Sequence, residues 1–135
     1  MKQSLGIVVL ILAITSIAVW LVWNHMEYLS ATKHDSGQWA VIQDIEGSML
    51  AIETTENRIW DQLVQLHQNG TEMWIGGVVE RYDNKWGFRF QPDTIIIAQF
   101  TIEGAQTTIS FLSEDIEDWI NFGIAYIGST VVEIH

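Results

Sequence analysis

Residues 73–103 read MWIGGVVERYDNKWGFRFQPDTIIIAQFTIE, and this stretch decides the fold class. It contains three runs rich in β-branched and aromatic residues, at 73–82, 85–90 and 94–103, which short turn sequences separate. Consecutive strands joined by tight turns pair in the antiparallel sense, so an antiparallel sheet is expected. The run at 94–103 is apolar on both faces near its start, which predicts that it is the central strand.

Further strands are expected on both sides of this stretch. Residues 39–44, WAVIQD, and 49–52, MLAI, have the apolar and β-branched composition of strands, and Glu46-Gly47 offers a turn between them. Near the end of the chain, 131–134, VVEI, predicts a closing strand. The sheet therefore draws on both halves of the chain.

A first helix is predicted over 55–68, where apolar residues recur at steps of three and four. A hydroxyl of Thr54 or Thr55 is expected to cap its first turn, because it can accept a hydrogen bond from an unpaired N–H group. Asn69-Gly70 supplies the stop.

A second helix is predicted from about 108 to 121 and ends at Gly123, for the same reason of spacing. A strand at 107–112 followed by a shorter helix from Ser113 is the alternative. The predicted class is α+β: one domain, 38–135, with a mostly antiparallel sheet and two helices packed on one face. The chain has no cysteine, so packing holds this domain without disulfides.

Before this domain stands an apolar run, residues 5–23, LGIVVLILAITSIAVWLVW, without charge or proline. As a helix it spans roughly 28 Å, which matches the hydrocarbon thickness of a bilayer. A cleaved signal peptide is the alternative, but its apolar region is usually shorter and a small-residue cleavage site follows it. We expect a single transmembrane anchor in contact with lipid, with a short N-terminus at 1–4 and a polar juxtamembrane linker at 24–37.

The orientation of the anchor is predicted from the basic groups beside it. Lys2 and the amino terminus precede the run, so the positive-inside rule places the N-terminus in the cytoplasm and the C-terminal domain outside it. The expected location is the cell membrane, with one span and an extracytoplasmic domain.

Composition argues against several functions. The net charge of −11 opposes nucleic-acid binding, because phosphate backbones are repelled. No zinc, EF-hand or nucleophile motif is present, so no catalytic, cofactor or metal residue is predicted, and an enzyme is not expected. The acidic cluster of Glu114, Asp115, Glu117 and Asp118 is interpreted as a solvated helix face.

Basic residues are scarce, so three in one hairpin are conspicuous: Arg81, Lys85 and Arg89. If they point outward, they form a cationic patch for an acidic partner or anionic ligand; the alternative is pairing with nearby carboxylates. The aromatic residues of the same hairpin are expected to anchor the sheet to the helices, namely Tyr82, Trp86, Phe88 and Phe90. Asn69 begins the tripeptide Asn-Gly-Thr, which matches the N-glycosylation pattern.

The block at 81–104, followed by TTISFLSEDIEDWI and the closing VVEI, resembles the binding-protein-seventy-four N-terminal domain family of small secreted domains. Its bacterial members are often labelled calmodulin, and a cysteine-free archaeal branch of unknown function is more similar still. The resemblance covers about residues 48–135 and implies the fold and an exported location, without an established activity. Secreted relatives usually carry a cysteine pair, which aligns near Ile102 and Ala125. The matching residues are Trp86, Phe88, Pro92, Asp93, Ile95 to Glu103, Gly104, Trp119, Val131 and Val132.

The predicted function is that of a single-pass, membrane-anchored extracytoplasmic binding or interaction domain, with a protein partner in or at the membrane. The alternative is a small accessory subunit of an integral membrane complex, for example a membrane-bound oxidoreductase. In that case the apolar helix itself would make the main contact.

Overall fold

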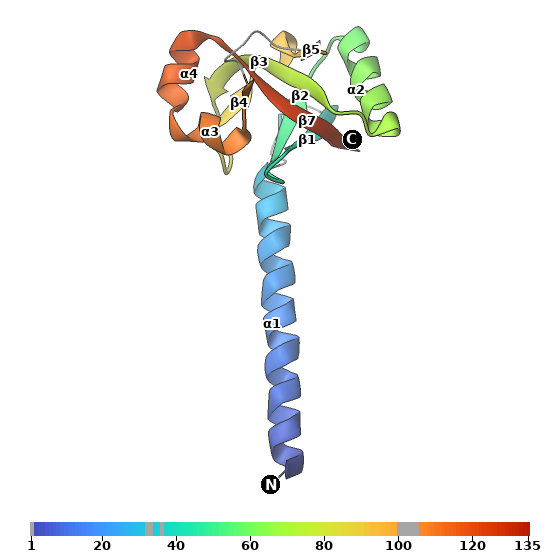
Figure 1. Ribbon diagram of the computed structural model, residues 1–135, viewed down its shortest axis with the longest axis vertical. Coiled ribbons are helices and arrows are strands. Elements are labelled where there is room, and N and C mark those ends of the chain that lie inside the picture. Colours follow the sequence, from blue (N-terminus) through green and yellow to red (C-terminus); the bar gives the residue numbers. More distant parts are fainter. Residues whose placement is uncertain (1, 32–33, 36, 100–105) are drawn as a thin grey trace. The chain divides into compact units, whose positions relative to one another are not determined.

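The computed structural model describes residues 2–31, 34–35, 37–99 and 106–135. The chain divides into a helical unit, 1–30, and an α+β unit, 31–135, which are drawn in Figure 1. The predicted α+β class, with a mostly antiparallel sheet behind an N-terminal apolar helix, is confirmed.

The helical unit is α1, Lys2–Ala31. Its segment Ser4–Trp23 is long and apolar enough to cross a membrane. Its two hydroxyls are satisfied within the helix, since Thr15 Oγ1 donates to Ile11 O at 2.8 Å and Ser16 Oγ donates to Leu12 O at 2.9 Å. The expectation of an irregular linker from residue 24 is wrong, because residues 24–31 contain no glycine or proline and the helix continues through them.

The α+β unit is built on one seven-stranded sheet, with the order β2-β1-β7-β3-β4; β5 pairs with β3, and β6 with β7. All its pairs are antiparallel except β6–β7, and the helices between those two strands form the crossover that a parallel pair requires. The strands are β1 Trp39–Asp44, β2 Met49–Glu53, β3 Met73–Arg81, β4 Phe88–Phe90, β5 Ile96–Ala98, β6 Gln106–Thr107 and β7 Ile124–Ile134.

The centre of the sheet is β7, which runs for 11 residues and pairs with β1, β3 and β6. Our prediction that 94–103 is the central strand is wrong. In that run only β5 is a strand, it pairs with β3 alone, and Pro92–Thr94 before it is a 3-10 helix. Ile95 is buried in the core while Ile96 is exposed. The apolar run therefore lies at an edge of the sheet and contributes Ile95 to the core. Residues 100–103 lie outside the described residues.

Helix α2, Asn57–Asn69, packs Ile59, Leu63 and Leu66 into the core, as their spacing predicted. Gly70 ends it in the left-handed conformation, with φ of 63°. Neither threonine caps the first turn of the helix. Thr54 Oγ1 accepts a hydrogen bond from the backbone N–H of Glu56, the residue just before the helix.

The second predicted helix is two helices, α3 Ile109–Glu114 and α4 Ile116–Phe122. Asp115 lies between them with φ −135° and ψ 53°, which breaks the helical path. Thr108 caps α3, since its hydroxyl accepts from Phe111 N at 3.2 Å. The same core cluster receives side chains of α2 and α3, so these helices share one face of the sheet. We call this the inner face, and the opposite side the outer face.

A buried carboxylate connects the first hairpin to α3. Asp44 Oδ1 accepts hydrogen bonds from Glu46 N and Ser48 N, both at 3.0 Å, and Asp44 Oδ2 accepts from Ile109 N at 2.9 Å. The β1–β2 turn and the start of α3 are thereby held by one side chain. Three charge-assisted hydrogen bonds compensate for its burial.

The two edge strands of the sheet approach each other. Trp86 lies in the turn before β4, and its Nε1 donates to Met49 O on β2 at 2.7 Å. Ser113 Oγ donates to Trp86 O at 2.8 Å, which ties the same turn to α3. The predicted strand 85–90 is therefore shorter than expected, because Asn84 Oδ1 accepts from Trp86 N and Gly87 N and closes a turn there.

Trp86→Ala should lower the free energy of unfolding by about 3 kcal/mol, because both apolar packing and the bond to Met49 are lost. Trp86→Phe keeps most of the packing and should cost about 1 kcal/mol. Gln62→Ala, exposed on α2, is the control and should change stability by less than about 0.5 kcal/mol. Urea unfolding of the full chain, followed by near-ultraviolet circular dichroism, measures all three. Unchanged stability in Trp86→Ala would contradict this anchoring role.

Candidate functional site

The three basic residues predicted to form a cationic patch do not form one. Arg89 points into a group of carboxylates, and its side chain is only 17% exposed. Its Nε lies 2.7 Å from Glu80 Oε1, and its Nη1 lies 3.0 Å from Asp35 Oδ2 and 3.4 Å from Glu53 Oε1. The prediction that Arg89 points outward is therefore wrong. The physical reason is Glu53, whose side chain is 6% exposed and whose buried charge requires a cation.

The other two basic residues are engaged elsewhere. Arg81 pairs with Glu117 of α4, and both side chains are exposed. Lys85 Nζ lies 4.8 Å from the ring centroid of Trp86. Pairing with carboxylates, the alternative that the sequence left open, describes Arg81 and Arg89. Asn69 is exposed at the end of α2, and its glycosylation remains a prediction.

Tyr82 completes the group around Arg89. Its hydroxyl donates to Asp35 Oδ1 at 2.8 Å, and the Arg89 guanidinium lies 4.2 Å from its ring centroid. Burial, then the hydrogen bond to Asp35 and its charge, raise the pKa of Tyr82 to about 12. Burial opposes the charge of Arg89, but its hydrogen bond to Glu80 and the surrounding carboxylates outweigh this and raise its pKa. We call these five residues the Arg89 cluster: Asp35, Glu53, Glu80, Tyr82 and Arg89.

The raised pKa of Tyr82 predicts how stability depends on pH. Because the folded pKa of about 12 exceeds the ordinary value of 10.0, the protonated phenol stabilises the fold. This contribution is complete below pH 10 and is lost as the pH rises toward 12. The difference in unfolding free energy between the wild type and Tyr82→Phe should shrink over that range, as measured by urea unfolding. Asp35→Asn should move the phenolate absorbance change toward lower pH; a difference independent of pH would contradict the assignment.

On the outer face, two aromatic rings lie against glycines of the neighbouring strand. Trp74 pairs with Gly128, and Gly76 pairs with Tyr126. A Cβ atom on Gly128 would lie 2.7 Å from Trp74 Cζ3, and one on Gly76 would lie 2.9 Å from Tyr126 Cδ1 and 2.0 Å from Ala125 O. Only glycine leaves room for the rings, which places them flat on the centre of the sheet.

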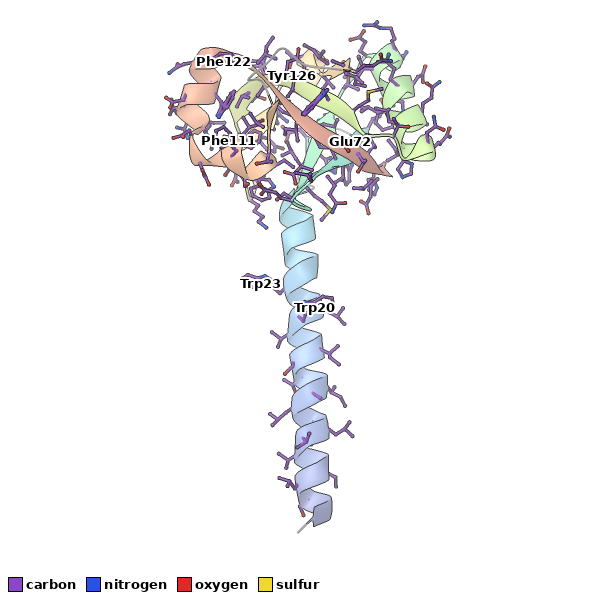
Figure 2. The ribbon with its side chains drawn as sticks, in the orientation of Figure 1. Trp20, Trp23, Glu72, Phe111, Phe122 and Tyr126 are labelled. Atoms are coloured by element: carbon purple, nitrogen blue, oxygen red, sulfur yellow. The ribbon has the colours of Figure 1, made fainter. Side chains whose placement is uncertain are left out.

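Beside Trp74 the outer face is hollowed into a groove of about 400 Å³, which we call the Trp74 groove. Two of its lining side chains, Glu72 and Phe111, are labelled in Figure 2 and come from the segment before β3 and from α3. No helix lies in front of β7 in Figure 1. The lining residues are Ile45, Glu72, Trp74, Thr107, Thr108, Phe111 and Gly128.

The polar groups of the Trp74 groove differ in how they are used. The Thr107 hydroxyl donates to Tyr126 O at 3.0 Å, and the Thr108 hydroxyl accepts from Phe111 N. Glu72 is exposed, and within the described ranges no hydrogen bond or ion pair engages its carboxylate. The groove therefore presents aromatic and aliphatic surface with one available charge.

Large apolar side chains are exposed at and near the groove. Ile45 is 90% exposed and Phe111 is 51% exposed, and both line it. Trp119 lies edge-to-face with Phe111 at 6.0 Å and with Phe122 at 5.7 Å, and Phe122 is 74% exposed. The exposed apolar surface of Ile45 and Phe111, which lies in the groove itself, is of the kind that marks interaction sites.

The acidic cluster and the histidines do not assemble into a metal site in the described part of the chain, where no three His, Cys, Asp or Glu side chains converge. Glu117 is taken by Arg81. The rings of His34 and His135 instead both stack on the ring of Trp39, each with its centroid 3.9 Å from the Trp39 centroid. This stack connects the segment after α1 to the end of β7.

Sequence reasoning missed the Trp74 groove, because the run at 73–82 predicts a strand but does not indicate that the Trp74 side chain lines an open groove. A signal was present: Gly76 and Gly128 lie within strands, where glycine marks a close approach of another group. Comparison with known proteins adds nothing to this picture, since no family model, curated protein or solved structure matches the chain. The resemblance to the binding-protein-seventy-four N-terminal domain family remains a prediction.

Proposed function

We propose that this protein is a single-pass, membrane-anchored binding module, and that its extracytoplasmic domain holds a protein partner in the Trp74 groove. The observation that carries the proposal is the exposure of Phe111 and Ile45 beside a tryptophan laid flat on the outer face. Exposing such residues is unfavourable in water, and a partner that covers them recovers that free energy.

The chemistry of the groove supports binding in preference to catalysis. Both threonine hydroxyls that line it are engaged in local hydrogen bonds, so neither is activated by a neighbouring base. The lining is otherwise apolar apart from Glu72. Such a surface suits recognition by shape and burial, and the acidic charge of the protein disfavours nucleic acid as the ligand.

The proposed topology has α1 in the membrane, with lipid around residues 5–23 and the N-terminus in the cytoplasm. A reporter fused after His135 should be active only outside the cytoplasm, and the mature protein should retain the apolar run at residues 5–23. Reporter activity in the cytoplasm would contradict the orientation. A mature N-terminus near residue 32 would show that the apolar run is a cleaved signal sequence.

One observation favours the accessory-subunit alternative. A hollow of about 470 Å³ runs along one side of α1, and small side chains at its middle leave room for another helix. Its lining residues follow helical spacing: Leu12, Thr15, Ser16, Val19, Trp20 and Trp23. In this case the partner is an integral membrane protein, for example a subunit of an oxidoreductase, and α1 makes the main contact.

Co-purification of the tagged full chain in mild detergent separates the two functions. Phe111→Ser should weaken binding of the partner by at least about tenfold, because truncating an interface aromatic commonly reduces affinity by that factor. Phe122→Ser is the control, since this aromatic is even more exposed than Phe111 but does not line the groove, and it should retain the partner. Lys85→Ala should also retain it.

The same co-purification experiment, carried out with substitutions in α1, tests the accessory-subunit alternative. Ser16→Leu fills the hollow on α1, and Ala18→Leu introduces the same side chain at a position of the helix that does not line this hollow. Loss of the partner with Ser16→Leu alone would favour the accessory subunit and contradict the groove proposal. Loss with Phe111→Ser alone supports the groove.

A further inference from the structure

We propose that the Trp74 groove recognises a lysine or arginine side chain carried on an apolar segment of the partner protein. This inference rests on the proposed function and adds the chemistry of its ligand. The juxtaposition that carries it is an available carboxylate, Glu72, beside the aromatic rings of Trp74 and Phe111 in one groove.

The Glu72 carboxylate provides a negative charge in the groove. Among the described residues, Glu72 is the only ionisable side chain that lines the groove, and no ion pair there neutralises it. A cationic ligand group would gain this charge as a partner, whereas an anionic group would be repelled. The net charge of −11 strengthens attraction of a basic segment during encounter.

The rings of Trp74 and Phe111 also favour a cationic ligand. A cation near the face of a tryptophan or phenylalanine ring is attracted by the electrons of that face, and tryptophan binds best. The protein already uses this chemistry internally. The Arg89 guanidinium lies 4.2 Å from the ring centroid of Tyr82 and contacts three carboxylates. The groove presents the same types of group, a ring and a carboxylate, without a cation of its own.

The apolar surroundings argue for a protein segment as the source of the cation. Ile45 and Phe111 expose far more apolar surface than an ammonium or guanidinium group covers. The aliphatic stem of a lysine or arginine, with apolar neighbours on the same segment, would cover that surface while its charged end reaches Glu72.

The test uses the full chain in nanodiscs of neutral phosphatidylcholine and the peptide acetyl-Leu-Lys-Phe-Lys-Leu-amide. A matched peptide has norleucine in place of both lysines, which removes only the ammonium groups. The readout is the indole N–H resonance of Trp74 in protein labelled with ¹⁵N-tryptophan, assigned with Trp74→Phe. The lysine peptide should produce a saturable shift, and the norleucine peptide should bind about tenfold more weakly.

Two protein variants locate the charge effect. Glu72→Gln should weaken the lysine peptide about fivefold and leave the norleucine peptide unchanged. Asp61→Asn removes the same charge from an exposed position on α2, which packs on the opposite face of the sheet, and should change affinity less than about twofold.

The outcomes separate this inference from the proposed function. Equal binding of both peptides, or equal effects of Glu72→Gln and Asp61→Asn, would overturn cation recognition and leave the groove as a binding site. If neither peptide shifts the Trp74 resonance at millimolar concentration, the cation inference is overturned. The groove itself then stands or falls with the loss of the co-purified partner in Phe111→Ser.

Discussion

The pair of Arg89 and Glu53 joins the two edges of the sheet, and the architecture depends on it. Glu53 ends β2, Arg89 lies in β4, and these strands stand at opposite ends of the strand order. Removing one partner of a buried ion pair leaves an uncompensated charge and commonly costs about 3–5 kcal/mol. In a small domain without disulfides, this is a large share of the total stability. Basic residues are few, and Arg89, which is largely buried, is used to join the two edge strands of the sheet.

Because the arginines of the hairpin are paired, the hairpin is not the candidate binding site. With Arg89 and Arg81 paired to carboxylates, the cationic surface that the sequence suggested is largely neutralised. The outer face of β3 and β7 remains, where two strand glycines allow Trp74 and Tyr126 to lie flat. Because β7 is both the longest strand and the centre of the sheet, the groove is supported by the most extensively paired backbone in the described domain.

Local patterns in the sequence were sufficient for most elements. The spacing of Ile59, Leu63 and Leu66 predicted α2, and the apolar and β-branched composition of 39–44 predicted β1. The same reasoning placed the centre of the sheet wrongly at 94–103. Residues 128–130 precede the predicted closing strand at 131–134, yet they continue β7 because they pair with β3 and β1, with Gly128 opposite Trp74. A contact between residues 54 positions apart in sequence leaves no local pattern.

The sequence by itself determined the α+β class, the apolar helix, the positions of most strands and the acidic charge, because these follow from side-chain size, spacing and polarity within short windows. Only the tertiary structure decided which strand is central, where Arg89 points and which tryptophan lines a groove on the outer face. Those properties depend on strand order and on the burial of Glu53. They arise from contacts between distant segments, whose free energies are set when the whole sheet is assembled.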